Sequence, residues 1–320
     1  MSKILCIGEA LIDMICTNKG QSLADGENFL KKPGGAPTNV AAAIAALGGK
    51  VDLVAKVGND PFGHQLIRVM KNFGVGTKWM LKDEKYFTTM AFVSLMQNGE
   101  RDFVFNRGAD GQLTDEDIAE INVKDYSIVH FGSATGFLKG PLQIAYKSLL
   151  QKANENNLFV SFDPNYRHLL FPNSPVDTQN FINQSWYFLQ NCNFFKLSDE
   201  EVLLITQTSE LEEAIKILKE KTTATFAITI GKEGTIFGYK GHTYKIPSIS
   251  ITPTDTTGAG DAFVGAVLFQ LHTKSLTDIK ALSVSNWENI ILNANKAGAR
   301  TCEYIGAMEA FKHLNANIFN

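Results

Sequence analysis

The 320-residue sequence has only four cysteines, and they lie far apart: Cys6, Cys16, Cys192 and Cys302. No C-x-x-C pair and no histidine at zinc-ligand spacing accompanies them, so we expect reduced thiols, no disulfide and no structural metal. The sequence also lacks any apolar run near the roughly 18 to 20 residues that a membrane-spanning helix needs. Its first apolar stretch does not form a signal-peptide core, because Gly8, Glu9 and Asp13 interrupt it. We therefore expect a cytoplasmic protein with no membrane association.

An excess of basic residues is missing too. Lysine and arginine number 30 against 33 aspartates and glutamates, which gives a formal net charge of −3 at pH 7. This balance offers no electrostatic reason to expect nucleic acid or an anionic membrane as a partner. Hydrophobic residues make up 44% of the chain and charged residues 20%, values typical of ordinary globular proteins. No repeat of fixed period occurs, which excludes solenoids and propellers.

The usual nucleotide-binding signatures are also absent. The sequence contains no G-x-x-x-x-G-K-[ST] segment, which excludes a Walker-type phosphate loop. The first predicted strand is followed by Gly8-Glu9-Ala10 and not by G-x-G-x-x-G, so a Rossmann dinucleotide site is unsupported. The metalloprotease motif H-E-x-x-H does not occur either.

What the chain does contain is an alternation of short apolar segments with amphipathic ones. The predicted strands are residues 4–7, 52–55, 128–131, 158–162 and 225–229. The predicted helices are residues 38–47, 62–73, 141–154, 199–205, 210–221 and 260–272. Such alternation predicts an α/β fold with a largely parallel sheet and helices on both of its faces.

Two stretches depart from this alternation, residues 11–32 and 86–107. Both have strand-like patterns without an intervening helix, and residues 88–95 and 102–105, joined across Asn98-Gly99, read as a hairpin. No linker divides the chain. We therefore expect one domain over residues 1–320 with a discontinuous β lid from about 11–32 and 86–107. Such an element could also serve as an oligomer contact.

The most informative segment is Asp255-Thr-Thr-Gly-Ala-Gly-Asp-Ala-Phe-Val-Gly265, which leads into a predicted apolar helix. Gly258, Ala259 and Gly260 let the backbone approach a ligand closely, and the free N–H groups at a helix start favour an anion. Asp261 would stand beside that anion, where a carboxylate could accept the proton of an attacking hydroxyl during phosphoryl transfer. The alternative is a tight turn with Asp261 as an ordinary helix-start residue.

A second glycine cluster, Pro33-Gly-Gly-Ala-Pro-Thr-Asn39, opens the predicted alanine-rich helix. Pro37 suits the first turn of a helix, and Gly34 and Gly35 leave the backbone open to a polar ligand. Asn39 could offer both a donor and an acceptor to a polyol. The alternative is a turn that lets a helix of small residues pack closely on the sheet, and these residues alone favour neither interpretation.

Together these segments resemble the two signatures of the ribokinase-like (pfkB-type) carbohydrate kinases. Residues 33–41 and 57–63 resemble the first signature, and residues 255–261 resemble the second. Further matching segments follow the family's order: Asp163-Pro-Asn-Tyr-Arg167, Lys196-Leu-Ser-Asp-Glu-Glu201 and Thr229-Ile-Gly-Lys-Glu-Gly234. The resemblance covers about residues 4–310 and implies the family's three-layer α/β sandwich with a small β lid. Within the family, these segments are most similar to fructokinases.

The resemblance implies roles for individual residues. Asp261 would deprotonate the primary hydroxyl of a sugar, while the amides of Gly258, Ala259 and Gly260 would hold the transferred phosphoryl group. The sugar-binding residues would be Asp13, Gly34, Gly35, Asn39, Phe103, Phe105, Arg107 and Arg167. Phe103, Phe105 and Arg107 alternate onto one strand face, where rings suit the apolar side of a sugar, although packing within the lid explains the phenylalanines equally well.

The resemblance also implies a nucleotide site and metal ions. The nucleotide-binding residues would be Ser198, Glu201, Thr229, Gly231, Gly234, Gly260 and Asn295. Glu201 matches the glutamate of the family's Asn-x-x-Glu motif, which organises magnesium and phosphate through water. Ser198 stands where that motif has its asparagine, so the amide contact of that position is lost. Asp255, Thr257 and Gly306 resemble the family's potassium loop.

The resemblance implies an ATP-dependent sugar kinase that uses Mg²⁺, with K⁺ as a further possible ion, and most closely a fructokinase forming fructose 6-phosphate. One alternative changes only the acceptor, to 2-keto-3-deoxygluconate, ribose or a nucleoside. A second alternative is a sugar-responsive binding protein on a kinase fold, which would have no need of Asp261. The expected partners are the sugar and ATP, with no nucleic acid, and a homodimer formed through the lid.

Overall fold

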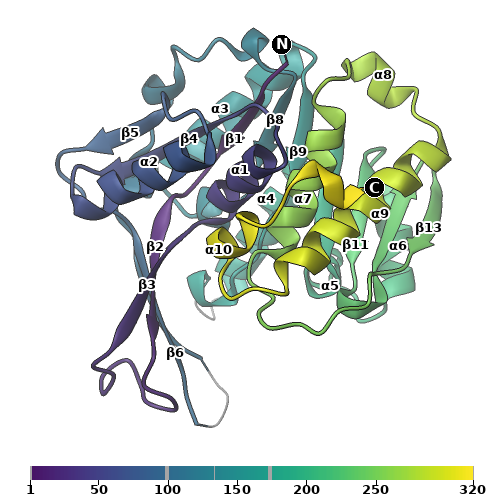
Figure 1. Cartoon of the computed structure of the whole chain (residues 1–320). Coiled ribbons are helices and arrows are strands. Elements are labelled where there is room, and N and C mark those ends of the chain that lie inside the picture. Colours follow the sequence, from purple (N-terminus) through teal and green to yellow (C-terminus); the bar gives the residue numbers. More distant parts are fainter. Residues whose placement is uncertain (1, 98–100, 133, 172–174, 320) are drawn as a thin grey trace.

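The computed structural model describes residues 2–97, 101–132, 134–171 and 175–319. Its main body is a three-layer α/β sandwich in which helices cover both faces of a nine-stranded sheet (Figure 1). In spatial order the strands are β13 (His242–Ile246), β12 (Thr235–Tyr239), β11 (Thr225–Thr229), β10 (Phe194–Ser198), β9 (Phe159–Phe162), β8 (Ile128–Phe131), β1 (Ile4–Ile7), β4 (Val51–Gly58) and β5 (Met80–Asp83). The strands from β11 to β5 pair in parallel, and β12 and β13 add an antiparallel edge.

The central strand β1 shows why the strands of this sheet are apolar throughout. Ile4 and Cys6 pack into the core on one face of the sheet, and Leu5 and Ile7 pack into the core on the other. Because helices exclude water from both faces, a continuous apolar run is favoured over alternation. The first face is covered by α1 (Ala36–Ala46), α2 (Pro61–Phe73), α7 (Ala259–Leu271), α8 (Leu276–Lys280), α9 (Val284–Thr301) and α10 (Ala307–Phe311). The second is covered by α3 (Pro141–Glu155), α4 (Pro175–Gln190), α5 (Asp199–Thr206) and α6 (Leu211–Lys221).

The alternation read from the sequence is confirmed, with limited differences at the element ends. The first helix begins at Ala36 and not at Thr38, because Pro37 is accommodated in its first turn. The pattern did not identify α4, α9 or the β12–β13 hairpin, since the many asparagines and glutamines of the two helices obscure their apolar faces. The Asn98-Gly99 turn of the predicted lid hairpin lies outside the described residues.

Contact between α1 and α7 joins the two glycine clusters of the sequence. A β-carbon on Gly265 of α7 would lie 2.9 Å from the Ala43 β-carbon of α1, so the two helices approach at the distance that small residues allow. Both helices are almost entirely buried, which explains why neither shows a strong polar face. Close packing of these helices therefore fixes Asn39, on α1, relative to Asp261, on α7.

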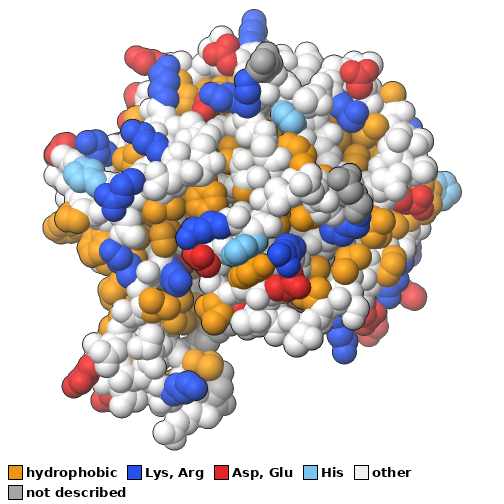
Figure 2. All heavy atoms as spheres, in the orientation of Figure 1, with side chains coloured by type: hydrophobic (Ala, Val, Ile, Leu, Met, Phe, Trp, Pro, Cys, Tyr) orange, Lys and Arg blue, Asp and Glu red, His pale blue; other side chains and the backbone are white. Residues whose placement is uncertain are grey.

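A separate four-stranded sheet projects from the body as the lid (Figure 1). Its spatial order is β3 (Phe29–Gly34), β2 (Leu11–Cys16), β6 (Met90–Leu95) and β7 (Arg101–Asn106), which correspond to the two segments expected to form it. Met14 and Met90 pack against the core of the main body. The space-filling view shows hydrophobic side chains gathered where the lid meets the body (Figure 2). The lid is thus anchored to the body at its base.

Asp60 organises the junction between α2 and the lid. Its carboxylate caps α2 by accepting hydrogen bonds from the N–H groups of Phe62 (2.9 Å) and Gly63 (2.8 Å). It also accepts from the backbone N–H (2.7 Å) and the hydroxyl (2.9 Å) of Thr88, just before β6. A β-carbon on Gly63 would collide with the carbonyl oxygen of Gly58. The segment 57–63 therefore ties the lid to the edge of the main sheet.

Two expectations about the chain as a whole can be compared with the structure. Within the described ranges, no helix has the length and apolar character required to cross a bilayer. All four cysteines are free thiols, and Cys6 and Cys302 are buried. Burial raises the pKa of the Cys6 thiol far above its usual range, which makes this cysteine unreactive.

Candidate active site

The second glycine cluster forms a sharp turn into α7 at the carboxyl edge of the sheet. Gly258 has φ 83°, in the left-handed region, and precedes the first helical residue, Ala259. A β-carbon on Gly258 would collide with the Ala307 side chain of α10, so glycine is required for its conformation and for its space. The N–H groups of such a helix start have no intrahelical partners, which makes the turn suited to an anion. The structure thus places Gly258, Ala259 and Gly260 at a helix start, where the Ala259 N–H donates to the Thr256 carbonyl at 3.2 Å.

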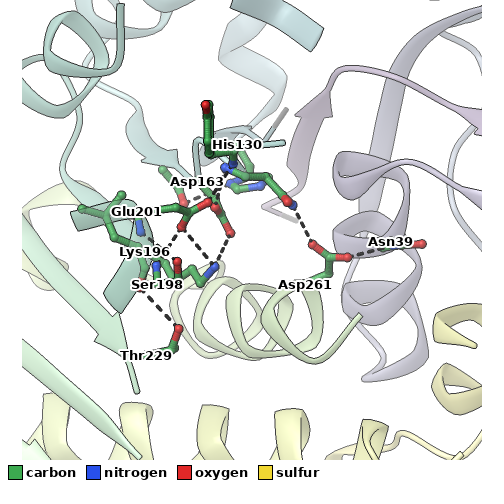
Figure 3. Close-up of polar contacts among 12 residues, drawn as sticks. Asn39, His130, Asp163, Lys196, Ser198, Glu201, Thr229 and Asp261 are labelled. Atoms are coloured by element: carbon green, nitrogen blue, oxygen red, sulfur yellow. Dashed lines mark hydrogen bonds and ion pairs between the residues drawn. The ribbon is translucent and has the colours of Figure 1, made fainter. Parts of the chain in front are cut away.

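Asp261 lies in the first turn of α7 and is buried, with side-chain amides on both of its oxygens (Figure 3). Asn39 Nδ2 donates to Oδ2 at 2.8 Å, and Asn165 Nδ2 donates to Oδ1 at 3.3 Å. Burial raises the pKa of this carboxyl, while the two amides and the nearby charges of Arg167 and Lys196 act to lower it. Burial outweighs these contacts, so the pKa of Asp261 lies above its usual value, while the two amides orient the carboxyl group as a general base requires.

A buried lysine and two further carboxylates lie beside Asp261 (Figure 3). Lys196 Nζ on β10 lies 3.3 Å from Asp163 Oδ2 and 3.8 Å from Glu201 Oε2. Burial raises the pKa of Asp163 to about 7, although the Lys196 charge opposes that shift. The neighbouring carboxylates raise the pKa of Lys196 against the effect of burial, so its ammonium stays charged. A compact charged cluster therefore lies beside the Gly258–Gly260 turn, made of Asp163, Lys196, Glu201 and Asp261.

Ser198 and Glu201 form the start of α5. The Ser198 hydroxyl accepts from the Glu201 N–H at 3.1 Å, and Glu201 Oε2 accepts from the Ser198 N–H at 2.7 Å, which is a capping box. Glu201 Oε1 accepts from the backbone N–H of Tyr166 at 2.8 Å. A serine at position 198 thus has a structural role as a cap. Glu201 is rigidly held yet keeps free lone pairs that could orient water.

The lid and the first glycine cluster form the other side of the site. Asp13 lies on β2, opposite Lys32 of β3, and burial raises the pKa of its carboxyl to about 6, while the charge of Arg167 opposes that shift. A β-carbon on Gly34 would collide with Asp13 Oδ2. Gly35 has φ 106° and would collide with the carbonyl oxygen of Glu9 if it carried a side chain. Both glycines are therefore required by the close approach of chains at this position.

The other predicted sugar-binding residues fall into two groups. Phe103 and Phe105 stack with ring centroids 6.3 Å apart and share the lid face of Asp13 through the pairing of β6 with β7. Arg107 instead holds the base of the lid: Nη1 donates to the Lys139 carbonyl at 3.0 Å and Nη2 donates to the Thr135 carbonyl at 3.0 Å. Its role in sugar binding stays a prediction, and these two bonds give it an anchoring role.

The predicted nucleotide residues lie along the edge of the sheet beyond β10. Ser198 pairs with Thr229 at the carboxyl ends of β10 and β11, and Gly231 and Gly234 both have positive φ in the loop that follows. Asn295 on α9 accepts from the Thr235 hydroxyl at 2.7 Å and donates to the Pro247 carbonyl at 3.1 Å. Because β10 and β11 are neighbours in the sheet, the loop after β11 lies near the charged cluster at the end of β10. Asn295 connects α9 to β12.

The predicted potassium loop is tightly connected. Asp255 Oδ1 accepts from the Thr257 N–H at 3.0 Å and hydroxyl at 2.7 Å, and Oδ2 accepts from the Gly306 N–H at 2.8 Å. Burial acts to raise the pKa of Asp255, but these hydrogen bonds outweigh it and the pKa lies below its usual value. The carboxylate thus joins the loop before α7 to the loop before α10, and any cation there would be held by backbone carbonyls.

Four site residues were given no role from the sequence: Glu9, Asp163, Asn165 and Lys196. Asp163 and Asn165 directly follow β9, Lys196 lies near the end of β10, and Glu9 follows β1, so all four stand at the carboxyl edge of a parallel sheet. Ligands bind preferentially at this edge, and that rule was the available signal. His130, on β8 nearby, is fully buried, and burial lowers its pKa to about 3, which keeps it neutral.

Comparison with known proteins shows the family of the chain. Residues 1–313 match the model of the pfkB family of carbohydrate kinases. A protein named "Probable fructokinase-4" from Arabidopsis thaliana is 33% identical over 314 residues, which cover 97% of this chain and 93% of that protein. The solved structure of a fructokinase with bound ATP from Xylella fastidiosa superimposes with a TM-score of 0.87 at 28% identity, covering 99% of this chain and 96% of that one.

A second solved structure carries more ligands. It is a fructokinase double mutant from Vibrio cholerae O395 in a form bound to fructose, ADP and potassium ion, with a TM-score of 0.83 and 25% identity over 100% of this chain and 97% of that one. The family match spans nearly the whole chain, and the turn, the buried carboxylate and the lid are all present. The chain belongs to the pfkB family of carbohydrate kinases and is an ATP-dependent sugar kinase.

Proposed function

We propose that this sugar kinase phosphorylates D-fructose at its primary hydroxyl to give fructose 6-phosphate and ADP. The observation that carries the reaction is the position of Asp261, a buried carboxylate held by two amides directly after a glycine turn at a helix start. The choice of fructose rests on similarity to proteins named as fructokinases, one of them 33% identical over 97% of this chain. In this proposal residues 1–320 form a single kinase domain with a discontinuous lid.

The chemistry proposed for Asp261 is general base catalysis. The sugar oxygen attacks the γ-phosphorus, the bond from that phosphorus to the ADP oxygen breaks, and the hydroxyl proton passes to Asp261. Asn39 and Asn165 hold the carboxylate so that a lone pair remains for that proton. In this proposal the turn formed by Gly258, Ala259 and Gly260 would face the transferred group, and its N–H groups would stabilise the charge.

The chain's residues fit ATP with Mg²⁺. The glycine turn offers a helix start to the phosphates, and Glu201, fixed by two backbone N–H groups, would act on the metal through water. When bound, Mg²⁺ would neutralise charge on the β- and γ-phosphates. The remaining nucleotide contacts would come from Ser198, Thr229, Gly231, Gly234, Gly260 and Asn295. The carbonyls around Asp255, Thr257 and Gly306 would hold K⁺.

The sugar would lie between the lid and α1. Asp13, Gly34, Gly35 and Asn39 would bind hydroxyls, since these positions converge on the edge that holds Asp261. Phe103 and Phe105 present stacked rings on the lid face of Asp13, where they would cover the apolar side of a sugar. Arg167 would contact the substrate or the transferring phosphate, because its charge acts on both Asp13 and Asp261. A closed lid would also exclude water.

The test measures ADP release with MgATP on fructose, 2-keto-3-deoxygluconate, ribose, mannose and adenosine, for the wild type and Asp261→Asn. We expect fructose-dependent turnover and a loss of about 10²- to 10⁴-fold in kcat for the variant, the usual contribution of a positioned base. Turnover only on another acceptor would support Asp261 as the base and would show that fructose is not the substrate. Sugar binding without turnover on any acceptor would overturn the mechanism and favour a binding protein.

A further inference from the structure

Lys196 is a buried cation at a position where a hydrophobic residue would have no desolvation cost. It lies on β10 among the buried apolar residues Phe194, Phe195 and Leu197, and its side chain is only 9% exposed. Burying an ammonium carries a large desolvation cost unless carboxylates or other acceptors compensate for it. Asp163 at 3.3 Å and Glu201 at 3.8 Å supply that compensation. A lysine retained at such cost calls for an explanation beyond packing.

The ammonium also lies against the glycine turn. A β-carbon on Gly260 would have Lys196 Nζ at 3.3 Å and Lys196 Cε at 3.6 Å as its neighbours. The ammonium therefore lies beside the first turn of α7, at the end of the helix that carries the positive part of its dipole. Two independent positive features meet where an anion would be placed.

The charges around the glycine turn are mostly negative. Asp163, Glu201 and Asp261 contribute three negative charges and Lys196 contributes one positive charge, so the cluster sums to −2 when all four are ionised. A γ-phosphoryl group brings further negative charge to the same position, and repulsion from three carboxylates would oppose its approach. An ammonium that faces the turn offsets that repulsion and would favour the transition state, in which charge is spread over the transferred oxygens.

We propose that Lys196 is a catalytic residue whose ammonium contacts the transferred phosphoryl group at the Gly258–Gly260 turn, while Asp163 and Glu201 position it. This role rests on the proposed function of the turn and of Asp261. Lys196 does not exchange a proton in this role; it supplies a fixed positive charge. The competing explanation is structural, in which Lys196 only neutralises Asp163 and Glu201.

The two roles are separated by a charge-matched double variant. Lys196→Met alone leaves Asp163 and Glu201 buried without their cation, and this loss alone would destabilise the protein. Lys196→Met combined with Asp163→Asn keeps the cluster sum at −2, because Glu201 and Asp261 remain. If Lys196 is structural, the double variant recovers both stability and turnover. If Lys196 contacts the phosphoryl group, the double variant recovers stability and remains slow.

The experiment measures kcat, the KM values for ATP and fructose, and the midpoint of thermal unfolding for the wild type, Lys196→Met, the double variant and Lys196→Arg. The matched control is Lys152→Met with Asp115→Asn, a half-exposed Lys–Asp pair at 3.6 Å whose lysine is in the last turn of α3. We expect Lys196→Met and the double variant to lose about 10²- to 10³-fold in kcat, the usual effect of removing one preorganised charge or donor. Lys196→Arg should recover part of that loss, because it retains the charge.

Recovery of kcat to within about threefold of the wild type in the double variant would overturn the proposal, since threefold is far below the effect of a lost catalytic charge. If the double variant does not fold, Lys196→Ala is assayed in folded form with ethylammonium added. Recovered turnover would support the proposal, and the absence of recovery would overturn it. Failure of the proposed function itself is distinguishable, because then the wild type would show no turnover on any acceptor.

Discussion

The ionisation of Asp261 depends on two side chains from opposite parts of the chain. Burial favours its protonated form, and the amides of Asn39 and Asn165 favour its charged form. Asn165 has φ 46°, a left-handed conformation that asparagine tolerates better than most residues. A strained backbone position and a hydrogen bond to the base thus coincide in one residue, which is consistent with a role in the site.

Asn165→Gly tests this contact without adding strain, because glycine accepts positive φ. Losing a donor to the carboxylate raises the pKa of Asp261, and the base works only when ionised, so the acid limb of kcat/KM should move to higher pH. The matched control is Asn157→Gly, another asparagine at positive φ (55°), which is exposed after α3. The measurement is kcat/KM for fructose from pH 5 to 9. An unmoved acid limb in the Asn165 variant would exclude a contribution of this amide.

Glu9 is a second buried carboxyl with a distinct role. It accepts hydrogen bonds from the Ala36 N–H and the Thr135 hydroxyl, both at 3.0 Å, and so joins the start of α1 to the segment after β8. Burial, opposed by these bonds and assisted by the nearby Asp110 charge, raises the pKa of Glu9 from 4.5 to about 8. Glu9 is therefore protonated in the folded protein over a pH range where it would be ionised in the unfolded chain.

The sign of the pH effect follows from this difference. Between pH 4.5 and about 8 the folded state holds a proton that the unfolded state has released, so the free energy of unfolding falls as pH rises through that window. Glu9→Gln, which mimics the protonated form, should remove this part of the slope. In urea unfolding at pH 5, 6.5 and 8, the free energy of unfolding of the variant should rise relative to that of the wild type as the pH increases. Parallel curves for the two proteins would contradict the assignment.

At the scale of elements, Asp60 is a single carboxylate that caps α2 and holds the start of β6. Its pKa lies below the usual value because hydrogen bonds from Thr88, Gly63 and Phe62 outweigh the opposing effect of burial. Asp60→Ala should lower the free energy of unfolding by about 1–3 kcal/mol, the range for a lost cap with unsatisfied donors. Asp60→Asn, which can still cap, should lose less. Equal stability of the alanine variant and the wild type in urea would refute this role.

The elements also show how far the sequence could be interpreted. Apolar runs such as Ile4–Ile7 and Ile128–Phe131 predicted the strands well, because residues buried on both faces have no polar positions to obscure the pattern. The glycine clusters predicted both turns, since positive φ and close approach require glycine. Contacts between distant segments could not be predicted in this way: the Asn165–Asp261 and Lys196–Asp163 pairs arise from strand order, which local pattern does not encode.

At the scale of the whole molecule, the two sheets differ in what covers them. The main sheet has helices on both faces, whereas the lid sheet projects away from the main body. The pairing of β3, β2, β6 and β7 places an apolar group of side chains on the lid face that carries Asp13: Ile15, Leu30, Val93, Leu95, Phe103 and Phe105. Ile15, Leu30 and Leu95 are 40%, 43% and 61% exposed. Exposed apolar patches of this kind mark interaction surfaces, so the homodimer through the lid stays a prediction, in which Ile15, Leu30 and Leu95 would contact a second copy of this chain.

A homodimer through this face would place each lid against the other. Ile15→Lys with Leu30→Lys should convert the dimer to a monomer, because each charge would be buried without a partner in the interface. The control is Val104→Lys, at a position 52% exposed on the opposite face of the lid, which should leave the dimer intact. Light scattering of the wild type and both variants measures the mass directly. A monomeric wild type at high concentration would refute the interface, whereas a dimer that the double lysine variant leaves intact would place the contact elsewhere on the molecule.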